Sequence, residues 1–156
     1  MSHKTNEEFR ADLAQFDTCM LVSRNGQQLR SRPMAPHFDN PDGSIRFLTS
    51  VKTHKVDEVK AHPDANAVFA HPDKTWISVS GKIRLSTEPA DIDELWSPEA
   101  APWFVEGKAE AIVLILEPEM AEYWDSGSKL KAGWELMKGA VTGQKPDIGS
   151  HGKIAM

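Results

Sequence analysis

The chain contains 156 residues, of which one is a cysteine, and its formal net charge is −5. This length suits one hydrophobic core, so we expect residues 1–156 to form a single domain. The mild acidity argues against a nucleic-acid-binding protein, which normally presents a basic surface. Because no segment has the pattern of a secretion signal or the length of an apolar membrane span, we expect a cytoplasmic protein with no membrane partner.

The N-terminal region predicts a helix followed by a strand. Residues 5–16 carry apolar side chains at helical intervals. Thr5 and Glu8 have the spacing of a capping box, in which each side chain bonds the backbone N–H group of the other residue. Cys19 begins an apolar run and has no second cysteine with which to form an internal disulfide, so we expect a buried structural thiol.

A β-hairpin is expected next. Residues 19–23 and 27–34 are predicted strands, and Asn25-Gly26 between them is a strong hairpin turn signal. Pro33 and Pro36 have no N–H group to donate to a neighbouring strand. The second strand is therefore expected to be an edge strand, a bulged strand or a broken strand end.

Strands and short helices are expected to alternate through the rest of the chain. Further strands are predicted over residues 45–49, 66–70, 76–85, 111–116 and 153–156. Helices are predicted over residues 53–61, 91–96, 118–124 and 128–141. Gly81 inside a predicted strand indicates a bulge or the close approach of another backbone. Many short strands with small helices between them indicate a β-barrel of the α+β class.

Polar residues at the ends of these elements form a pattern typical of a phosphate site. Arg32 offers a planar fork of donors that can bind two phosphate oxygens at once. Thr49, Ser50 and Thr53 can add hydroxyl donors, and the helix that begins near Lys55 adds free backbone N–H groups. Apolar side chains lie between these polar groups, namely Met34, Phe47 and Leu48. The pattern suits a flat cofactor with a phosphate tail; the alternative is an ordinary surface hairpin whose polar side chains are only solvated.

The sequence contains no other strong catalytic motif. It has no Cys-x-x-Cys and no His-Glu-x-x-His, so we expect no metal site, and it has no Gly-x-Ser-x-Gly. Residues 149–153 resemble a phosphate loop only faintly, because the spacing is wrong and Ile154 stands where Ser or Thr is needed. We identify no catalytic acid or base. The five tryptophans slightly favour an interface between chains, because aromatic residues are enriched there.

An ordered series of segments carries a family resemblance. The segments are residues 29–34, 47–49, 54–56, 76–81, 94–98, 103–107 and 121–125. Together they resemble the FMN-binding split-barrel superfamily of pyridoxamine 5′-phosphate oxidase, and within it the general stress protein 26 branch. The resemblance implies a mainly β (α+β) fold, namely a six-stranded split β-barrel with small flanking helices. It also implies a homodimer with FMN, rather than FAD, in each of two clefts between the subunits.

The resemblance assigns expected roles to individual residues. Arg32 and Lys55 are expected to neutralise the FMN phosphate. Residues 31–34 and 47–50 are expected to line the flavin ring, partly through backbone groups, and Trp124 to approach it from the partner chain. The expected cofactor-binding residues are Ser31, Arg32, Pro33, Met34, Phe47, Leu48, Thr49, Ser50, Thr53, His54, Lys55, Trp76 and Trp124.

The function implied by the resemblance is that of an FMN-dependent oxidoreductase acting on a small molecule, with NAD(P)H as one candidate. Two alternatives stay open: a flavin-binding protein without turnover, serving as a flavin reservoir or redox sensor, and a structural dimer with an empty cleft. Residues 145–156 lack the Arg- and His-containing segment with which pyridoxamine 5′-phosphate oxidases close their substrate site, so that activity is not expected. His37 stands where the family often has a lysine.

Overall fold

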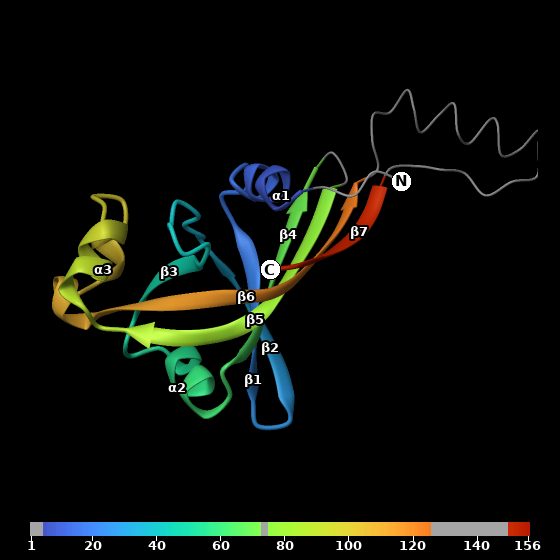
Figure 1. Ribbon diagram of the computed structural model, residues 1–156. Coiled ribbons are helices and arrows are strands. Elements are labelled where there is room, and N and C mark those ends of the chain that lie inside the picture. The colour runs from blue at the N-terminus through green and yellow to red at the C-terminus, as the bar shows by residue number, and fades with distance from the viewer. Residues whose placement is uncertain (1–4, 73–74, 126–149) are drawn as a thin grey trace, which may run out of the picture.

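The computed structural model describes residues 5–72, 75–125 and 150–156 (Figure 1). Its strands are β1 (Cys19–Asn25), β2 (Gln28–Met34), β3 (Ile45–Ser50), β4 (Asp64–His71), β5 (Thr75–Ser86), β6 (Ala111–Asp125) and β7 (Ser150–Ala155). Its helices are α1 (Asn6–Leu13), α2 (His54–Ala61) and α3 (Pro89–Leu95), with 3-10 turns η1 (Ala101–Trp103) and η2 (Gly107–Glu110). The predicted helix over residues 128–141 lies outside the described residues. No helix in the described part of the chain is long and apolar enough to cross a membrane.

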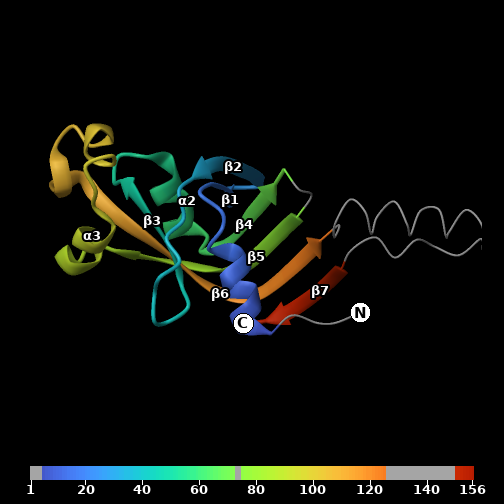
Figure 2. The same ribbon diagram turned by 90° about the horizontal axis from the view of Figure 1, so that it is seen from above.

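The strands form one antiparallel sheet that curls without closing. Six strands follow the order β2-β1-β4-β5-β6-β3, and β7 pairs with β6 beside this path. In the described chain no ladder joins the two end strands, β2 and β3, so an open seam remains between them. This arrangement confirms the split barrel: six strands follow the main path, and β7 is the last strand, which was predicted over residues 153–156 and begins earlier, at Ser150. Figures 1 and 2 show α3 at one end of the sheet and β7 at the other.

The capping box of α1 is present as predicted. The Glu8 backbone N donates to Thr5 Oγ1 at 3.3 Å, and the Thr5 backbone N donates to Glu8 Oε2 at 2.8 Å. The helix places Phe9 and Leu13 in the main core. It ends at Leu13, before the predicted end at Phe16, although Phe16 also packs in that core.

The predicted hairpin is confirmed. Asn25 pairs with Gln28, and Gly26 in the loop has φ +60°, a conformation that glycine adopts without steric cost. Pro33 lies on β2, whose outer edge has no neighbouring strand in the described chain. The proline is tolerated there because an edge strand leaves backbone positions that need not donate.

The helix predicted over residues 118–124 is wrong, because these residues continue strand β6. Pro118 suggested a helix start, but Ala121 and Tyr123 are buried at strand spacing and pair with β5. Pro118 lies opposite Gly81, where the β5–β6 register shifts. A Cβ atom on Gly81 would lie 2.0 Å from the Glu117 carbonyl oxygen, so the predicted close backbone approach is confirmed.

Two hydrophobic clusters cover the first half of β6 on both faces. The main core contains Leu114 and Leu116, and the second cluster, beneath α3, contains Val113 and Ile115. Helix α2 packs against β1 and β5. Cys19 is buried in the main core as expected, and burial raises the pKa of its thiol to about 12.

Candidate functional site

Arg32 lies on the edge strand β2 and reaches over the neighbouring strand β1 to α2, which packs against β1 and β5. It pairs in register with the buried Leu21 of β1, so its side chain projects to the inner face of the sheet. Its guanidinium donates to Ser23 Oγ at 2.6 Å and to Glu58 Oε2 at 2.8 Å. Its side chain is 20% exposed and that of Glu58 is 9% exposed, so the ion pair is largely shielded from water.

Lys55 lies in the first turn of α2 and reaches the end of β3. Its Nζ donates to Thr49 Oγ1 at 2.9 Å, and Thr49 is itself buried. The pKa of Lys55 is lowered, first by burial and then by the positive charge of Arg32, while Glu58 acts in the opposite direction. We call Ser23, Arg32, Thr49, Lys55 and Glu58 the seam cluster.

The charges of the seam cluster fit a bound phosphate. Two cations, Arg32 and Lys55, lie near one carboxylate, that of Glu58, which forms an ion pair with Arg32 in a partly buried place. An anion bound between the cations would offset both causes that lower the pKa of Lys55, because it adds negative charge beside the two side chains. Charge-assisted bonds to such an anion are stronger than bonds between neutral groups.

The other polar residues predicted for the phosphate lie beside the seam cluster and bond within their own loop. The Thr53 hydroxyl donates to the Ser50 carbonyl oxygen at 2.9 Å, and the Lys52 backbone N donates to Ser50 Oγ at 3.2 Å. Thr53 is the N-cap residue of α2, but its side chain makes no capping bond. His54 is the exposed first residue of that helix. These residues surround the helix start, whose free N–H groups favour an anion.

The residues predicted to line a flavin ring fall into three environments. Ser31 and Pro33 are exposed on the outer face of β2. Met34 packs against the main core, and Phe47 is fully buried within it, so the Phe47 side chain has no surface to offer a ligand. Leu48 points to the opposite face of β3, where it packs against the second cluster.

Trp76 and Trp124 are not brought to the seam cluster within one chain. They are paired residues of β5 and β6, and they are 42% and 38% exposed on the outer face of the sheet. The Trp124 ring stacks on His151 with centroids 5.1 Å apart and planes 8° apart. His151 Nε2 also lies 2.7 Å from Glu122 Oε1. The expected contact of either tryptophan with a flavin therefore requires a second chain.

A half-open cavity of about 430 Å³ adjoins the seam cluster. Its lining comes from the end of β3, the start of α2, the connection after β2, and the segment from α3 to η1. The lining residues are Ala35, His37, Leu48, Thr49, Ser50, Thr53, Leu95, Ser97, Glu99, Ala100, Trp103 and Phe104. Sequence reasoning did not assign Ser97 or Glu99 to a site, although residues 94–98 were among the segments that carried the resemblance.

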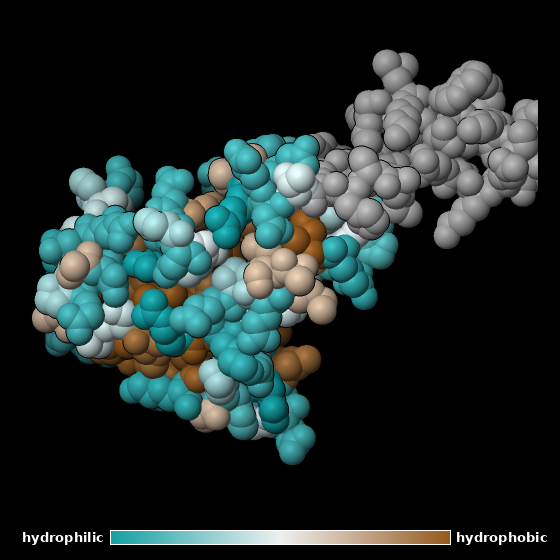
Figure 3. Space-filling view, viewed as in Figure 1, coloured by the Kyte–Doolittle hydropathy of each residue, from teal (hydrophilic) through white to brown (hydrophobic). Residues whose placement is uncertain are grey.

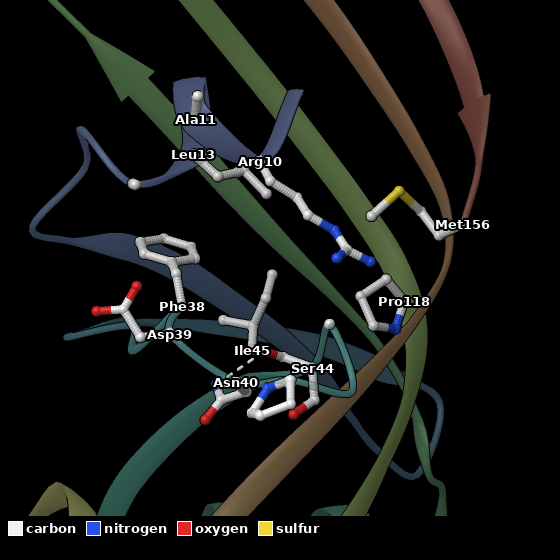
Figure 4. A pocket seen from close by; sticks show the side chains of 13 residues that line it. Arg10, Ala11, Leu13, Phe38, Asp39, Asn40, Ser44, Ile45, Pro118 and Met156 are labelled. Carbon is white, nitrogen blue, oxygen red and sulfur yellow. Dashed lines mark hydrogen bonds between the residues drawn. The ribbon is translucent and has the colours of Figure 1, made fainter. Parts of the chain in front are cut away.

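A second cavity, of about 520 Å³, lies between α1, the connection from β2 to β3 and the chain end at Met156 (Figure 4). Figure 4 shows the Arg10 guanidinium pointing into it, above the Asn40 amide, which donates to the Ser44 carbonyl oxygen at 2.9 Å. This cavity shares no residue with the seam cluster or with the predicted cofactor set. The first cavity is therefore the one linked to the candidate site.

The comparisons with known proteins agree with this fold. The family model for proteins that are pyridoxamine 5′-phosphate oxidase like matches residues 4–147. The chain therefore belongs to the pyridoxamine 5′-phosphate oxidase-like family. No curated protein matches the chain significantly.

Solved structures confirm the resemblance to the general stress protein 26 branch. A protein of Jannaschia sp. CCS1 described as a general stress protein 26 is 28% identical, with TM-score 0.76 over 96% of this chain and 97% of that chain. A general stress FMN/FAD binding protein of Xanthomonas citri is 28% identical, with TM-score 0.68 over 79% of this chain and 89% of that chain. A pyridoxamine 5′-phosphate oxidase-related, FMN binding protein of Nostoc punctiforme PCC 73102 is 14% identical, with TM-score 0.67 over 100% and 99% of the two chains, and supports the fold alone.

Proposed function

We propose that the chain binds FMN at the seam cluster and acts as a flavin-dependent oxidoreductase. The observation that carries this proposal is the placement of two cations, Arg32 and Lys55, beside a single carboxylate near the open seam of the sheet. The name of the Xanthomonas relative, which is described as FMN/FAD binding, supports it. A role in the stress response is proposed on the Jannaschia and Xanthomonas relatives, which are described as general stress proteins.

Each residue of the seam cluster has a task in this proposal. Arg32 binds phosphate oxygens with its remaining guanidinium N–H groups, while Glu58 and Ser23 hold the guanidinium in place. Lys55 adds the second positive charge, and Thr49 fixes its position through the 2.9 Å bond. When bound, the flavin supplies the redox chemistry, and the protein supplies binding, orientation and electrostatics. No side chain is proposed as a catalytic residue.

We also propose a homodimer with FMN at the subunit interface. Large apolar side chains are exposed on the outer face of the sheet, namely Met20, Trp76, Met120 and Trp124. Figure 3 shows further apolar surface between α2 and α3, along β5 and β6. A second copy of the chain would bury such surface and bring Trp124 toward the flavin. Light scattering of the FMN-loaded protein should give the mass of a dimer; a monomer mass at micromolar concentration would count against this assembly.

The absorbance spectrum of the purified protein, followed by flavin titration, tests the cofactor. We expect about one FMN per chain and much weaker binding of riboflavin, because riboflavin lacks the phosphate that forms the charge-assisted bonds. A parallel titration with FAD tests the preference for FMN. Equal affinity for FMN and riboflavin would contradict a phosphate site at the seam cluster.

Turnover separates the oxidoreductase from a flavin reservoir or redox sensor. Steady-state oxidation of NADH or NADPH with a range of electron acceptors should exceed the rate with free FMN. Binding of FMN without such turnover would favour the non-catalytic alternative. Pyridoxamine 5′-phosphate should not be oxidised. Rapid flavin bleaching on mixing with it would instead identify the protein as a pyridoxamine 5′-phosphate oxidase.

A further inference from the structure

The second cavity, which we call the α1 cavity, supports an inference that is independent of the flavin site. Its volume of about 520 Å³ falls in the range of small-molecule sites. Its walls come from α1, the connection between β2 and β3, Pro118 of β6 and the chain end at Met156. Since none of its lining residues is predicted to bind FMN, a ligand can occupy it while FMN stays bound.

The floor of the α1 cavity is apolar. Leu13 and Ile45 are buried in the main core, and Phe38 and Met156 are only partly buried where they pack against it. Figure 4 shows Met156 and Pro118 on one side of the cavity and Phe38 on the other. A ligand that covers these side chains removes apolar surface from water, which is favourable. The cavity therefore suits a ligand with an apolar body.

Two polar side chains of the lining already bond within their own loop. The Asn40 amide nitrogen donates to the carbonyl oxygens of His37 at 3.0 Å and of Ser44 at 2.9 Å, so both of its hydrogens are used. The Ser44 hydroxyl donates to Asp42 Oδ1 at 2.6 Å and accepts from Arg46 Nε at 3.1 Å. Neither side chain has a donor left for a ligand.

The Arg10 guanidinium, by contrast, is free and points into the α1 cavity (Figure 4). Within residues 5–72, 75–125 and 150–156, no hydrogen bond or ion pair engages it. It lies over Gly43, where a Cβ atom would be 2.5 Å from Arg10 Nη2, so the missing side chain leaves room for it. Asp39 also lines the cavity, but Figure 4 shows its carboxylate on the far side, beside Phe38.

This combination of charge and apolar surface favours a carboxylate. The planar fork of guanidinium donors matches the two oxygens of a carboxylate group, and such bonds are charge-assisted. Among the lining residues that the structure describes, the charged side chains are Arg10 and Asp39. One cation opposite one carboxylate suits a singly charged anion, whereas the two cations of the seam cluster suit a phosphate.

We propose that the α1 cavity binds a small monocarboxylic acid with an apolar body, of the arylalkanoate or medium-chain alkanoate class. Arg10 binds its carboxylate, and Phe38, Ile45 and Met156 contact its apolar part. The protein then has two anion sites of different chemistry, one for the phosphate of the flavin and one for an apolar carboxylate.

A pair of matched probes tests this inference by isothermal titration calorimetry. 4-Phenylbutanoate carries one negative charge near pH 7, and 4-phenylbutanamide has the same ring and chain without the charge. Each is titrated into the full chain, both flavin-free and loaded with FMN. We expect the carboxylate to bind roughly three- to tenfold more tightly than the amide, because an exposed arginine adds a charge-assisted bond that water weakens. The preference should be the same with and without FMN.

Two variants locate the binding in the α1 cavity. Arg10→Ala should abolish the preference for the carboxylate, and α1 should persist because alanine favours a helix. Met156→Ala should weaken both probes by a similar factor, about two- to fivefold, and keep the preference, because it removes only apolar contact.

Arg24→Ala is the matched control for charge. Arg24 lies next to the β1–β2 turn, where it donates to the Gly26 carbonyl oxygen at 3.2 Å, and Figure 1 shows this turn far from α1. Both affinities should stay unchanged in this variant. Circular dichroism establishes that each variant is folded before the affinities are compared.

The outcomes separate this inference from the proposed function. Equal affinity for the two probes, no detectable binding of the carboxylate, or an unchanged preference in Arg10→Ala would overturn the inference while FMN binding stands. Loss of carboxylate binding on loading with FMN would also overturn it, because the carboxylate would then occupy the seam cluster. If the chain binds no FMN, the proposed function fails, and the flavin-free titrations of the unaltered chain and of Arg10→Ala still decide this inference.

Discussion

Two arginines flank the open seam of the sheet, and the charges around them differ. Arg46 on β3 forms ion pairs with three carboxylates, those of Asp42, Asp91 and Glu94. Arg32 on β2 forms an ion pair with one carboxylate, that of Glu58, and has the cation Lys55 beside it. Both side chains are largely buried, at 11% and 20% exposed. The surplus of positive charge, and not the arginine itself, distinguishes the candidate anion site.

The surroundings of Arg46 show a structural role. Its guanidinium lies 3.1 Å from Asp91 on α3 and 3.3 Å from Asp42 in the connection between β2 and β3. Its Nε also donates to Ser44 Oγ at 3.1 Å. These bonds hold the connection and α3 against β3. All three guanidinium nitrogens of Arg46 are therefore used to stabilise the fold. Arg32, by contrast, shares its carboxylate with a second cation and can accept an added anion.

The largest expected effect is the loss of stability in Arg46→Ala. Removing this guanidinium takes the nearest cation from three carboxylates, of which Asp42 keeps only Arg84 at 3.9 Å, and breaking a largely buried ion pair in this way costs on the order of 3 kcal/mol. Thermal unfolding should show a clearly lower Tm. The Kd for FMN of the folded protein should stay within about twofold, because the Arg46 guanidinium bonds groups outside the seam cluster.

Arg84→Ala is the matched control for stability. Arg84 is 52% exposed and pairs with Glu117, which is 57% exposed, and at 3.9 Å with Asp42, which is 46% exposed. Exposed ion pairs contribute little, so this variant should unfold within about 1 kcal/mol of the unaltered chain. If Arg46→Ala were as stable as Arg84→Ala, the structural role assigned to Arg46 would be wrong.

The next largest effect is expected on cofactor affinity, in Arg32→Ala. A hydrogen bond to a charged group contributes roughly 1.5–3 kcal/mol, so the affinity for FMN should fall by about one to two decades. Arg32→Lys should recover only part of this loss, because the two-pronged guanidinium geometry is missing. Fluorescence titration of FMN measures both variants, and riboflavin binding should change far less.

Arg46→Ala serves as the control in that titration, because it removes the same charge from the other side of the seam. Circular dichroism of each variant establishes that the protein is folded before the affinities are compared. Equal loss of FMN affinity in the two variants would show that overall charge, and not the seam cluster, governs binding.

Local sequence signals predicted several elements of the fold. The Thr5–Glu8 capping box, the Asn25-Gly26 turn and the edge position of Pro33 each need only neighbouring residues, and each is confirmed. The helix predicted from Pro118 was wrong because the pairing of β6 with β5, which is not local, outweighed the proline signal.

The charges around the two arginines show why the site was predicted only in part. The sequence pointed to Arg32 and Lys55 as partners of an anion, but it did not reveal Glu58 as the carboxylate they share. The spacing of Lys55 and Glu58, three residues apart on one helix, places them on one face and could have indicated it. The acids around Arg46 come from segments 42–44 and 91–94, far from each other in sequence, so only the fold could show that Arg46 is neutralised.

A smaller effect is expected in the pH dependence of FMN binding. The pKa of Lys55 is lowered in the flavin-free protein, so the unfolded chain binds this proton more tightly than the folded chain does. The charged lysine therefore costs stability at neutral pH, and this cost disappears as the pH rises through the lowered folded pKa toward 10.5. Phosphate binding needs the charged form, so FMN affinity should begin to fall at a pH below the ordinary pKa of lysine.

Lys55→Arg isolates this contribution, because arginine stays protonated throughout the range. Titrations of FMN between pH 7 and 10.5 should show an earlier loss of affinity in the unaltered chain than in Lys55→Arg. The flavin itself titrates identically in both experiments, so the difference reports on Lys55. Identical pH profiles would remove Lys55 from the phosphate site and leave Arg32 as its main cation.

The smallest effect on FMN affinity is expected in Glu58→Gln, a variant that tests whether surplus positive charge distinguishes Arg32 from Arg46. Glutamine keeps an oxygen that can accept from Arg32 and Ser23, as Glu58 does now, but it removes the only carboxylate of the seam cluster. The cluster then carries a larger positive surplus, so FMN should bind more tightly by on the order of 1 kcal/mol or less, a few-fold in Kd. The pKa of Lys55 should fall further, because Glu58 is the group that now raises it.

Asp57→Asn is the matched control for this last variant, because it removes the same charge from the exposed neighbouring position of α2. It should change FMN affinity less than Glu58→Gln does, since solvent screens an exposed charge. The alkaline loss of FMN affinity should move to lower pH in Glu58→Gln and stay in place in Asp57→Asn. Weaker FMN binding in Glu58→Gln would mean that the carboxylate acts mainly to orient Arg32, and the surplus of positive charge would then not be the property that separates Arg32 from Arg46.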